Sequence, residues 1–190
     1  MIRRAHVADV PSMARIINDA AEFGLMLPRS LAALYENLRD FQVAVDEQGQ
    51  VIGTAALTII WANLAELASL AVDANHRGKG LGKQLARACL EEARAQGIKR
   101  VMTLTYEQPF FEKLGFHVVD RQTLPLKVWR ECVRCPKNQA CDEIAMIIEF
   151  DDVTEVQAPR PETPPADEYV IPVTLTARGR RPTPPPVEGD

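Results

Sequence analysis

The chain has 190 residues, of which 46% are hydrophobic and 25% charged, and its formal net charge is −4. This length allows one domain with a proper hydrophobic core, and the composition is ordinary for a globular protein. The negative charge argues against broad nucleic-acid binding, which normally needs a basic surface. No apolar run reaches the roughly 18 residues of a membrane span. The first residues also lack a secretory signal's apolar region, so we expect a cytoplasmic location.

The first part of the chain, up to residue 74, alternates between helical and strand-like hydrophobic spacing. Turn and cap residues separate the segments. These patterns first predict a strand over residues 2–4 and then two helices. The first helix has Asp9 as its N-cap and Pro11 in its first turn, and the second is capped by Ser30. Two strands within 41–60, joined by a turn at 47–49, and a strand over 64–72 follow.

The second part begins with a long amphipathic segment. Leu81, Leu85, Cys89 and Ala93 recur at every fourth position, which predicts one apolar stripe on a helix that ends near Gln96. The stretches "KRVMTLT", "QPFFEKLG", "FHVVD" and "EIAMIIEF" then predict a strand, a short helix and two strands. The expected order, β-α-α-β-β-β-α-β-α-β-β, indicates a mixed α/β (α+β) fold.

Proline and acidic residues are concentrated in residues 151–190. Nine of the fourteen prolines lie there, together with eight acidic residues and four arginines. Such a composition does not build a packed core, so we expect a largely disordered tail after a folded domain at about residues 1–150. The apolar stretch "YVIPVTLT" within it could dock as an edge strand or bind a partner.

Residues 75–85, "NHRGKGLGKQL", place three glycines and several cations between a predicted strand and a predicted helix. This arrangement suits a phosphate group, because glycine lets the backbone approach and the N–H groups at the helix start point at the anion. The alternating glycines fit neither the P-loop nor the dinucleotide fingerprint. A structural turn with solvated cations is therefore the alternative.

Arg77-Gly78-Lys79-Gly80-Leu81-Gly82 resembles the [Q/R]-x-x-G-x-[G/A] acetyl-CoA loop of the GNAT acetyltransferases. "AELASLAVDANHRGKGLG" and "PFFEKLGF" resemble that family's fourth strand and its late helix and turn. The resemblance covers about residues 1–150 and implies a mixed central sheet of about six to seven strands flanked by helices, with acetyl-CoA as cosubstrate. The coenzyme contacts that it implies are Leu70, Ala71, Val72, Arg77, Gly78, Lys79, Gly80, Leu81, Gly82, Lys83 and Phe111.

A narrower resemblance is carried by "GLMLPRSLAALYENLRDFQVAVD", "AELASLAV", "LTYEQPFFEKLGF" and "LPLKVW", in that order. These stretches are similar to the acetyltransferase domain of N-acetylglutamate synthases. The resemblance implies acetyl transfer to the α-amine of L-glutamate, the first step of arginine biosynthesis. Many such enzymes carry a kinase-like domain in front, whereas the GNAT-like part here begins at residue 1, which predicts a short stand-alone form and leaves arginine feedback open. GNAT domains often dimerise, so a homodimer is compatible with this reading.

Acyl transfer to an amine needs a base, a donor to the developing oxyanion, and an acid for the thiolate. The resemblance implies a splay between the fourth and fifth strands, where a backbone N–H of Leu70, Ala71 or Val72 would face the thioester carbonyl. Glu66 is the candidate base; a solvent-facing strand carboxylate is the alternative. Phe111 stands where the family often has a tyrosine that acts as the general acid for the thiolate. Tyr106 is the candidate whose hydroxyl could reach the sulfur instead. The alternative is that Tyr106 is a partly buried tyrosine with its hydroxyl at the surface.

A dicarboxylic acceptor needs cations that can hold its carboxylates. The resemblance implies that Arg29 and Ser30, between the first two helices, and Lys127 on the late segment bind glutamate. The alternatives are that Ser30 is only an N-cap and that Lys127 is a solvated lysine.

Three cysteines, Cys132, Cys135 and Cys141, follow C-x2-C-x5-C spacing. A C-x2-C pair is a common half-site for zinc, and thiolates also suit iron–sulfur clusters. Only three ligands are local, and His117 or Asp142 could supply a fourth. Plain reduced cysteines and a redox pair are the alternatives.

Two other functions remain open from the sequence. A GNAT enzyme could acetylate a protein N-terminus, a lysine or another small amine. A non-catalytic acyl-CoA-binding module could use the proline-rich tail to engage partners.

Overall fold

A computed structural model describes residues 1–124 and 142–155. Every described helix and strand belongs to one compact unit, which begins at Met1. The predicted order of helices and strands is confirmed. The elements are β1 (Ile2–Arg4), α1 (Val10–Glu22), α2 (Leu31–Glu36), β2 (Phe41–Val45), β3 (Val51–Trp61), β4 (Leu64–Val72), α3 (Leu81–Ala95), β5 (Arg100–Thr105), α4 (Gln108–Glu112), β6 (His117–Val118) and β7 (Ile144–Glu149).

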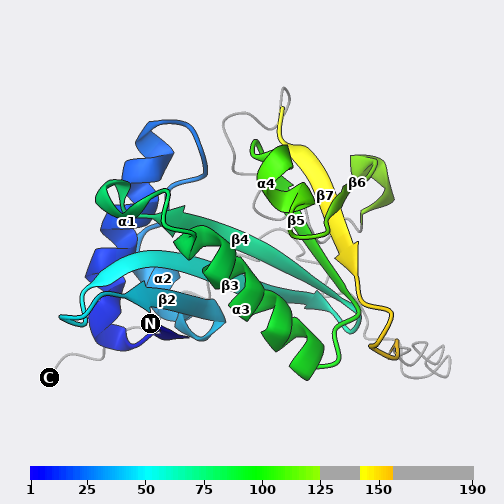
Figure 1. The fold of residues 1–190 in the computed structure, drawn as a ribbon, viewed down its shortest axis with the longest axis horizontal. Helices are drawn as coiled ribbons and strands as arrows, with labels where there is room; N and C mark the ends of the chain where they lie inside the picture. Colours follow the sequence, from blue (N-terminus) through cyan, green and yellow to red (C-terminus); the bar gives the residue numbers. More distant parts are fainter. Residues whose placement is uncertain (125–141, 156–190) are drawn as a thin grey trace, which may run out of the picture. The chain divides into compact units, whose positions relative to one another are not determined.

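The strands form one seven-stranded sheet in the order β1-β2-β3-β4-β5-β7-β6 (Figure 1). All neighbouring pairs are antiparallel except β4 and β5, which run parallel. The parallel pair is joined by α3, as such a crossover requires. The mixed sheet expected from the resemblance to GNAT acetyltransferases is therefore confirmed.

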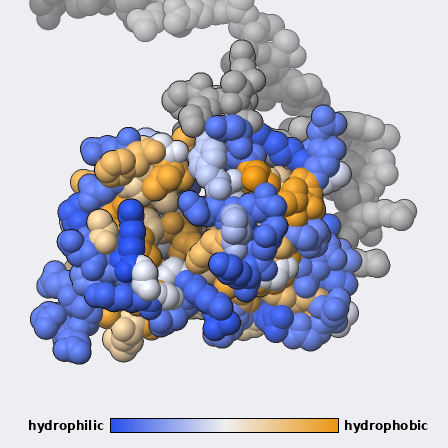
Figure 2. Space-filling model, turned by 45° about the horizontal axis from the view of Figure 1, so that its top comes forward, coloured by the Kyte–Doolittle hydropathy of each residue, from blue (hydrophilic) through white to orange (hydrophobic). Residues whose placement is uncertain are grey.

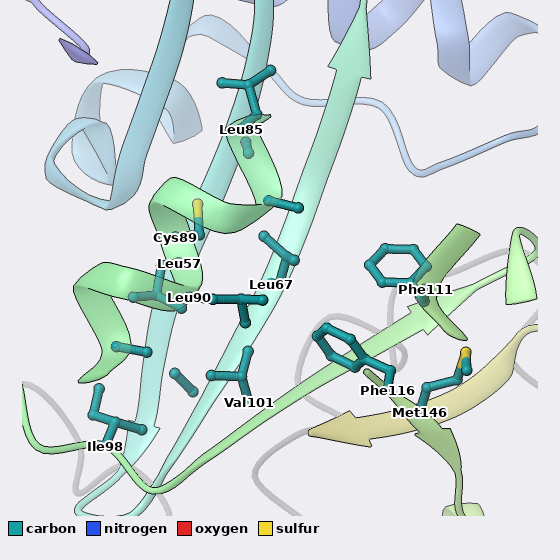
Figure 3. Close-up of a cluster of buried hydrophobic side chains, with 14 of the residues drawn as sticks. Leu57, Leu67, Leu85, Cys89, Leu90, Ile98, Val101, Phe111, Phe116 and Met146 are labelled. Carbon is teal, nitrogen blue, oxygen red and sulfur yellow. The ribbon is translucent and has the colours of Figure 1, made fainter. Parts of the chain in front are cut away.

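Hydrophobic side chains pack on both faces of this sheet, because successive residues of a strand point to opposite sides. On β3, Ala55 and Leu57 pack with residues of α3, whereas Ala56 packs with residues of α1 and α2. The predicted stripe of α3 is largely buried: Leu85, Cys89 and Ala93 are inaccessible to solvent, and Figure 3 shows the first two facing the strands. Burial raises the pKa of the Cys89 thiol to about 12, so this cysteine is a core residue.

The sheet is interrupted at its centre, where β4 and β5 separate. Their recorded pairing runs only from Leu64 to Glu66, although β4 continues to Val72. Opposite β3, the register of β4 shifts near Ser69, whose φ of 51° is unusual for a residue with a side chain. The edge of β4 beyond Glu66 therefore faces a gap, as the implied splay requires.

The two predicted helix caps have different outcomes. Ser30 caps α2 as expected, since its Oγ accepts a hydrogen bond from the Ala33 N–H at 3.2 Å. Asp9 occupies the N-cap position of α1, but its carboxylate makes no cap bond there. It instead accepts hydrogen bonds from the Arg3 guanidinium, at 2.6 and 3.0 Å, and from the His6 N–H at 2.7 Å. The Arg3 hydrogen bonds chiefly lower the pKa of Asp9.

Several predictions fall on residues 125–141 and 156–190, outside the described part of the chain. They concern Lys127, the cysteines Cys132, Cys135 and Cys141, and the proline-rich tail. Within residues 1–124 and 142–155, none of the helices has both the length and the apolar character needed to cross a membrane.

Candidate active site

A cavity of about 580 Å³ lies where β4 and β5 separate. Its walls come from the segment after α1, from β4 beyond residue 65, from the glycine turn before α3, and from β5 with the start of α4. Figure 2 shows a hollow on one face of the protein in which hydrophobic side chains gather between hydrophilic flanks. The cavity thus brings together segments that are far apart in the sequence.

The glycine turn forms one end of the cavity. Gly78 and Gly80 both have φ of 76°, a conformation that favours glycine, and Gly80 is the N-cap of the 15-residue helix α3. The first N–H groups of α3 have no partners within the helix and are available to an anion. Arg77, Gly78 and Gly82 line the cavity, whereas the other predicted loop contacts, Lys79, Gly80, Leu81 and Lys83, are not part of its lining. Their contacts with the coenzyme stay predictions.

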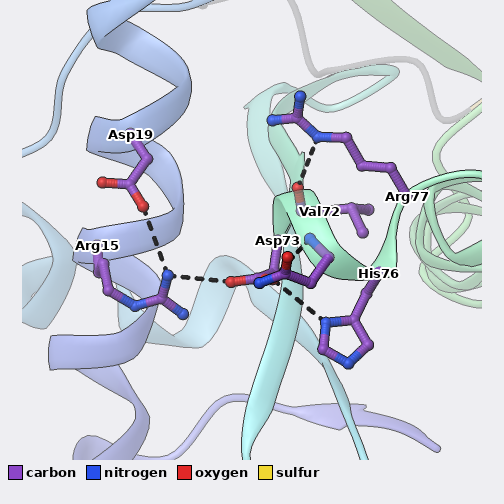
Figure 4. Close-up of polar contacts among 7 residues, drawn as sticks. Arg15, Asp19, Val72, Asp73, His76 and Arg77 are labelled. Carbon is purple, nitrogen blue, oxygen red and sulfur yellow. Dashed lines mark hydrogen bonds and ion pairs between the residues drawn. The ribbon is translucent and has the colours of Figure 1, made fainter.

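A cluster of polar side chains holds the start of this turn in place (Figure 4). The sequence did not reveal this cluster. Asp73, directly after β4, accepts hydrogen bonds from the Arg15 guanidinium of α1 and from the Asn75 N–H, both at 3.0 Å, and lies 3.3 Å from His76 Nδ1. The hydrogen bond with His76, followed by that with Arg15, lowers the pKa of Asp73. The Arg77 Nε in turn donates to the Val72 carbonyl at 3.1 Å. These contacts fix the direction in which the chain enters the turn.

Two glycines of the turn give a matched test of phosphate binding. We expect Gly80→Ala to weaken acetyl-CoA binding about tenfold and to cost about 1 kcal/mol of stability, because its φ is left-handed. Gly82→Ala should have little effect on stability, because a Cβ there would lie 3.7 Å from the Phe110 ring, an ordinary contact, and the family pattern accepts alanine. Titration with acetyl-CoA and thermal unfolding measure both effects. Equal losses for the two variants would contradict this account of the turn.

The open edge of β4 supplies the next part of the site. Leu70, Ala71 and Val72 all line the cavity, at the point where β4 no longer pairs with β5. Backbone N–H groups that point toward this gap have no strand partner on that side. The geometry is compatible with the implied hydrogen bond to a thioester carbonyl, which stays a prediction.

Glu66 lies on β4 at the last rung that pairs with β5, opposite Met102, and its half-buried side chain lines the cavity. Two further carboxylates, which sequence reasoning missed, also line it: Glu107 at the start of α4 and Glu143 just before β7. Glu66 lies closest in the chain to the open edge of β4. This position favours Glu66 among the three as the base.

Tyr106 also lines the cavity, directly after β5. Its hydroxyl donates a hydrogen bond to Asp142 Oδ1 at 2.8 Å. The pairing of Thr105 with Ile144 explains this contact, because it brings the residues before β7 beside the end of β5. Whether Tyr106 protonates the thiolate stays a prediction.

Phe111 lines the cavity as predicted and is almost fully buried. Its ring makes edge-to-face contacts with Phe110 of the same helix and with Phe116, just before β6. Of the two residues considered as a fourth metal ligand, His117 lies on the exposed strand β6, and Asp142 accepts a hydrogen bond from Tyr106. Residues 1–124 and 142–155 contain no group of three metal-ligating side chains.

Arg29 lines the cavity from the segment between α1 and α2, beside Leu25, Met26 and Leu27. Ser30 is not part of the lining, and its hydroxyl caps α2. The structure therefore brings one predicted acceptor residue, Arg29, into the same cavity as Glu66 and the open edge of β4. Binding of glutamate by either residue stays a prediction.

The chain is similar in sequence to known acetyltransferases. The model of the acetyltransferase (GNAT) family matches residues 12–116. The chain is 40% identical over 146 residues to an uncharacterized N-acetyltransferase of Chlorobaculum tepidum, which covers 77% of this chain and 94% of that protein. It is 33% identical over 136 residues to the amino-acid acetyltransferase of Mycobacterium tuberculosis, covering 70% and 78%. For the amino-acid acetyltransferase of Neisseria meningitidis serogroup A, the chain spans only 29% of the relative's length.

Solved structures agree in fold. A protein of Mycobacterium tuberculosis in complex with CoA and NLQ has a TM-score of 0.70 at 28% identity, covering 79% of this chain and 99% of that one. The N-acetylglutamate synthase of Neisseria gonorrhoeae, complexed with coenzyme A and N-acetyl-glutamate, also has a TM-score of 0.70 at 28% identity. That match covers 78% of this chain and 34% of the synthase.

Proposed function

The chain belongs to the GNAT family of acetyl-CoA-dependent N-acetyltransferases, and on that premise we propose that it acetylates the α-amine of L-glutamate. The observation that carries the proposal is that Arg29 and Glu66 line one cavity with the open edge of β4. A guanidinium can bind a carboxylate in two parallel hydrogen bonds, which suits a dicarboxylic acceptor. The amino-acid acetyltransferases among the relatives support the same class of acceptor.

In the proposed reaction, the glycine turn and the start of α3 bind the pyrophosphate of the coenzyme. Glu66 takes a proton from the ammonium of glutamate, directly or through water, so that the neutral amine can attack the thioester carbonyl. A backbone N–H of the open edge of β4 stabilises the negative charge that develops on the carbonyl oxygen. The carbon–sulfur bond then breaks, the acetyl group stays on the nitrogen, which loses its second proton to solvent as the amide forms, and the thiolate leaves with coenzyme A. Tyr106 also lines this cavity and is the candidate to protonate that thiolate.

One observation favours a second candidate function. The lining carries three carboxylates, Glu66, Glu107 and Glu143, against the two guanidinium groups of Arg29 and Arg77. Carboxylates attract a cationic acceptor, so a peptide N-terminus, a lysine or another small amine is the alternative.

The two candidates are separated by a thiol-release assay with acetyl-CoA and a panel of acceptors. The panel contains glutamate, aspartate, glutamine, lysine and a short peptide with a free N-terminus. We expect glutamate to give the highest kcat/KM. Faster release with lysine or the peptide would overturn the proposal in favour of the second candidate.

A further inference from the structure

Asn18 on α1 makes two hydrogen bonds with the backbone of a single residue, Arg29. Its Nδ2 donates to the Arg29 carbonyl at 3.1 Å, and its Oδ1 accepts from the Arg29 N–H at 2.9 Å. A side-chain amide presents a donor and an acceptor side by side, as a strand backbone does. It therefore fixes both the position and the rotation of the peptide units on either side of Arg29.

The segment that carries Arg29 is also held at its two ends. At its start, the Gly24 and Leu25 N–H groups donate to carbonyls of α1 at 2.8 and 3.3 Å. At its end, Ser30 caps α2. Residues 25–27 and Arg29, between these anchors, line the cavity. The Asn18 contact lies within this stretch, at Arg29, whose guanidinium carries the positive charge.

We propose that Asn18 is a positioning residue for acceptor binding, which acts through Arg29 and does not touch the substrate. The inference rests on the proposed function in one respect, namely that Arg29 binds a carboxylate of the acceptor. Asn18 is not part of the cavity lining and is half-buried on α1. It would set the direction of the Arg29 side chain, since that direction follows from the backbone that Asn18 holds.

The kinetic effect expected from changing Asn18 follows from the proposed binding of an acceptor carboxylate by Arg29. A carboxylate clamp that binds substrate and transition state equally changes KM for the acceptor and leaves kcat unchanged. We expect Asn18→Ala to raise the acceptor KM about tenfold, the order expected for net loss of such hydrogen bonds. KM for acetyl-CoA should stay within about twofold, because the glycine turn is held by the separate contact of Arg15 with Asp73.

Two further variants separate this role from a general loss of structure. Asn18→Asp keeps nearly the same shape and still accepts from the Arg29 N–H, but it places a carboxylate oxygen against the Arg29 carbonyl. We expect it to raise the acceptor KM at least as much as Asn18→Ala. Asp19→Asn is the matched control, because Asp19 is exposed on the same helix turn and its carboxylate lies 3.4 Å from the Arg15 guanidinium.

A double-mutant cycle tests the proposal directly. In an Arg29→Ala background, Asn18→Ala should cause almost no further rise in acceptor KM, because the residue through which it acts is already gone. Independent, multiplying effects of the two substitutions would overturn the proposal. So would an unchanged acceptor KM in both Asn18→Ala and Asn18→Asp.

Acceptor rates of the wild-type protein test the proposed function separately from the role of Asn18. If it acetylates another acceptor better than glutamate, the glutamate assignment fails and the same cycle is measured with that acceptor. Strong coupling of Asn18 with Arg29 would then still support the positioning role, and additive effects would overturn it.

Discussion

Glu66→Gln is expected to lower kcat by about a hundredfold or more, because a positioned general base typically contributes about 10² to 10⁴ in rate. Glutamine keeps the shape of the side chain but cannot accept a proton from the ammonium. The residue lies at the last paired rung of β4, next to the open edge that would hold the thioester, so no other group should replace it without rearrangement. Binding of acetyl-CoA, measured by direct titration, should stay unchanged.

Matched controls for this variant are available in the same cavity. Glu107→Gln and Glu143→Gln remove the two other lining carboxylates and should each lower kcat much less. Rates measured at several pH values separate loss of a base from loss of binding, because supplying more neutral amine at high pH should partly restore Glu66→Gln. A larger loss in either control than in Glu66→Gln would assign the base to that residue instead.

Arg29→Ala is expected to raise KM for glutamate by about 30-fold to 160-fold. A charge-assisted pair of hydrogen bonds to a carboxylate contributes about 2 to 3 kcal/mol, and alanine provides no replacement. Arg29→Lys should recover only part of the loss, because an ammonium cannot form the same planar pair.

Acetyl-CoA serves as the internal control for this variant. Its KM should be little affected, since Arg29 lies on the segment after α1 and the glycine turn precedes α3. An unchanged KM for glutamate in Arg29→Ala would remove Arg29 from the acceptor site.

Local patterns predicted the features that short stretches of chain determine. The glycine turn could be identified because its positive φ values favour glycine, and the glycines within residues 77–82 directly precede a predicted helix. The stripe of α3 is likewise visible in hydrophobic spacing. The strand that bears Glu66 has no regular spacing, and it is predicted because the segment is too short for a helix and lies between turns. The resemblance added what spacing does not contain, namely the separation of β4 from β5.

Contacts that depend on how one element packs against another were not predictable in this way. The Asp9 carboxylate binds Arg3 of the neighbouring strand instead of capping its own helix, because the fold brings a guanidinium within 2.6 Å. Glu143 enters the cavity only because β7 pairs with β5, and nothing near it in the sequence indicates that pairing. The pair of Asn18 with Arg29 likewise depends on how the chain returns after α1.

The most direct test of acetyl transfer to glutamate is a competition experiment. Isotopically labelled acetyl-CoA is added to the protein with equal concentrations of glutamate, glutamine, aspartate, lysine and a short peptide, and the products are identified by mass spectrometry. The account predicts that the label appears mainly on the α-nitrogen of glutamate and that Glu66→Gln abolishes most of it. Label found mainly on lysine or on the peptide would contradict the account.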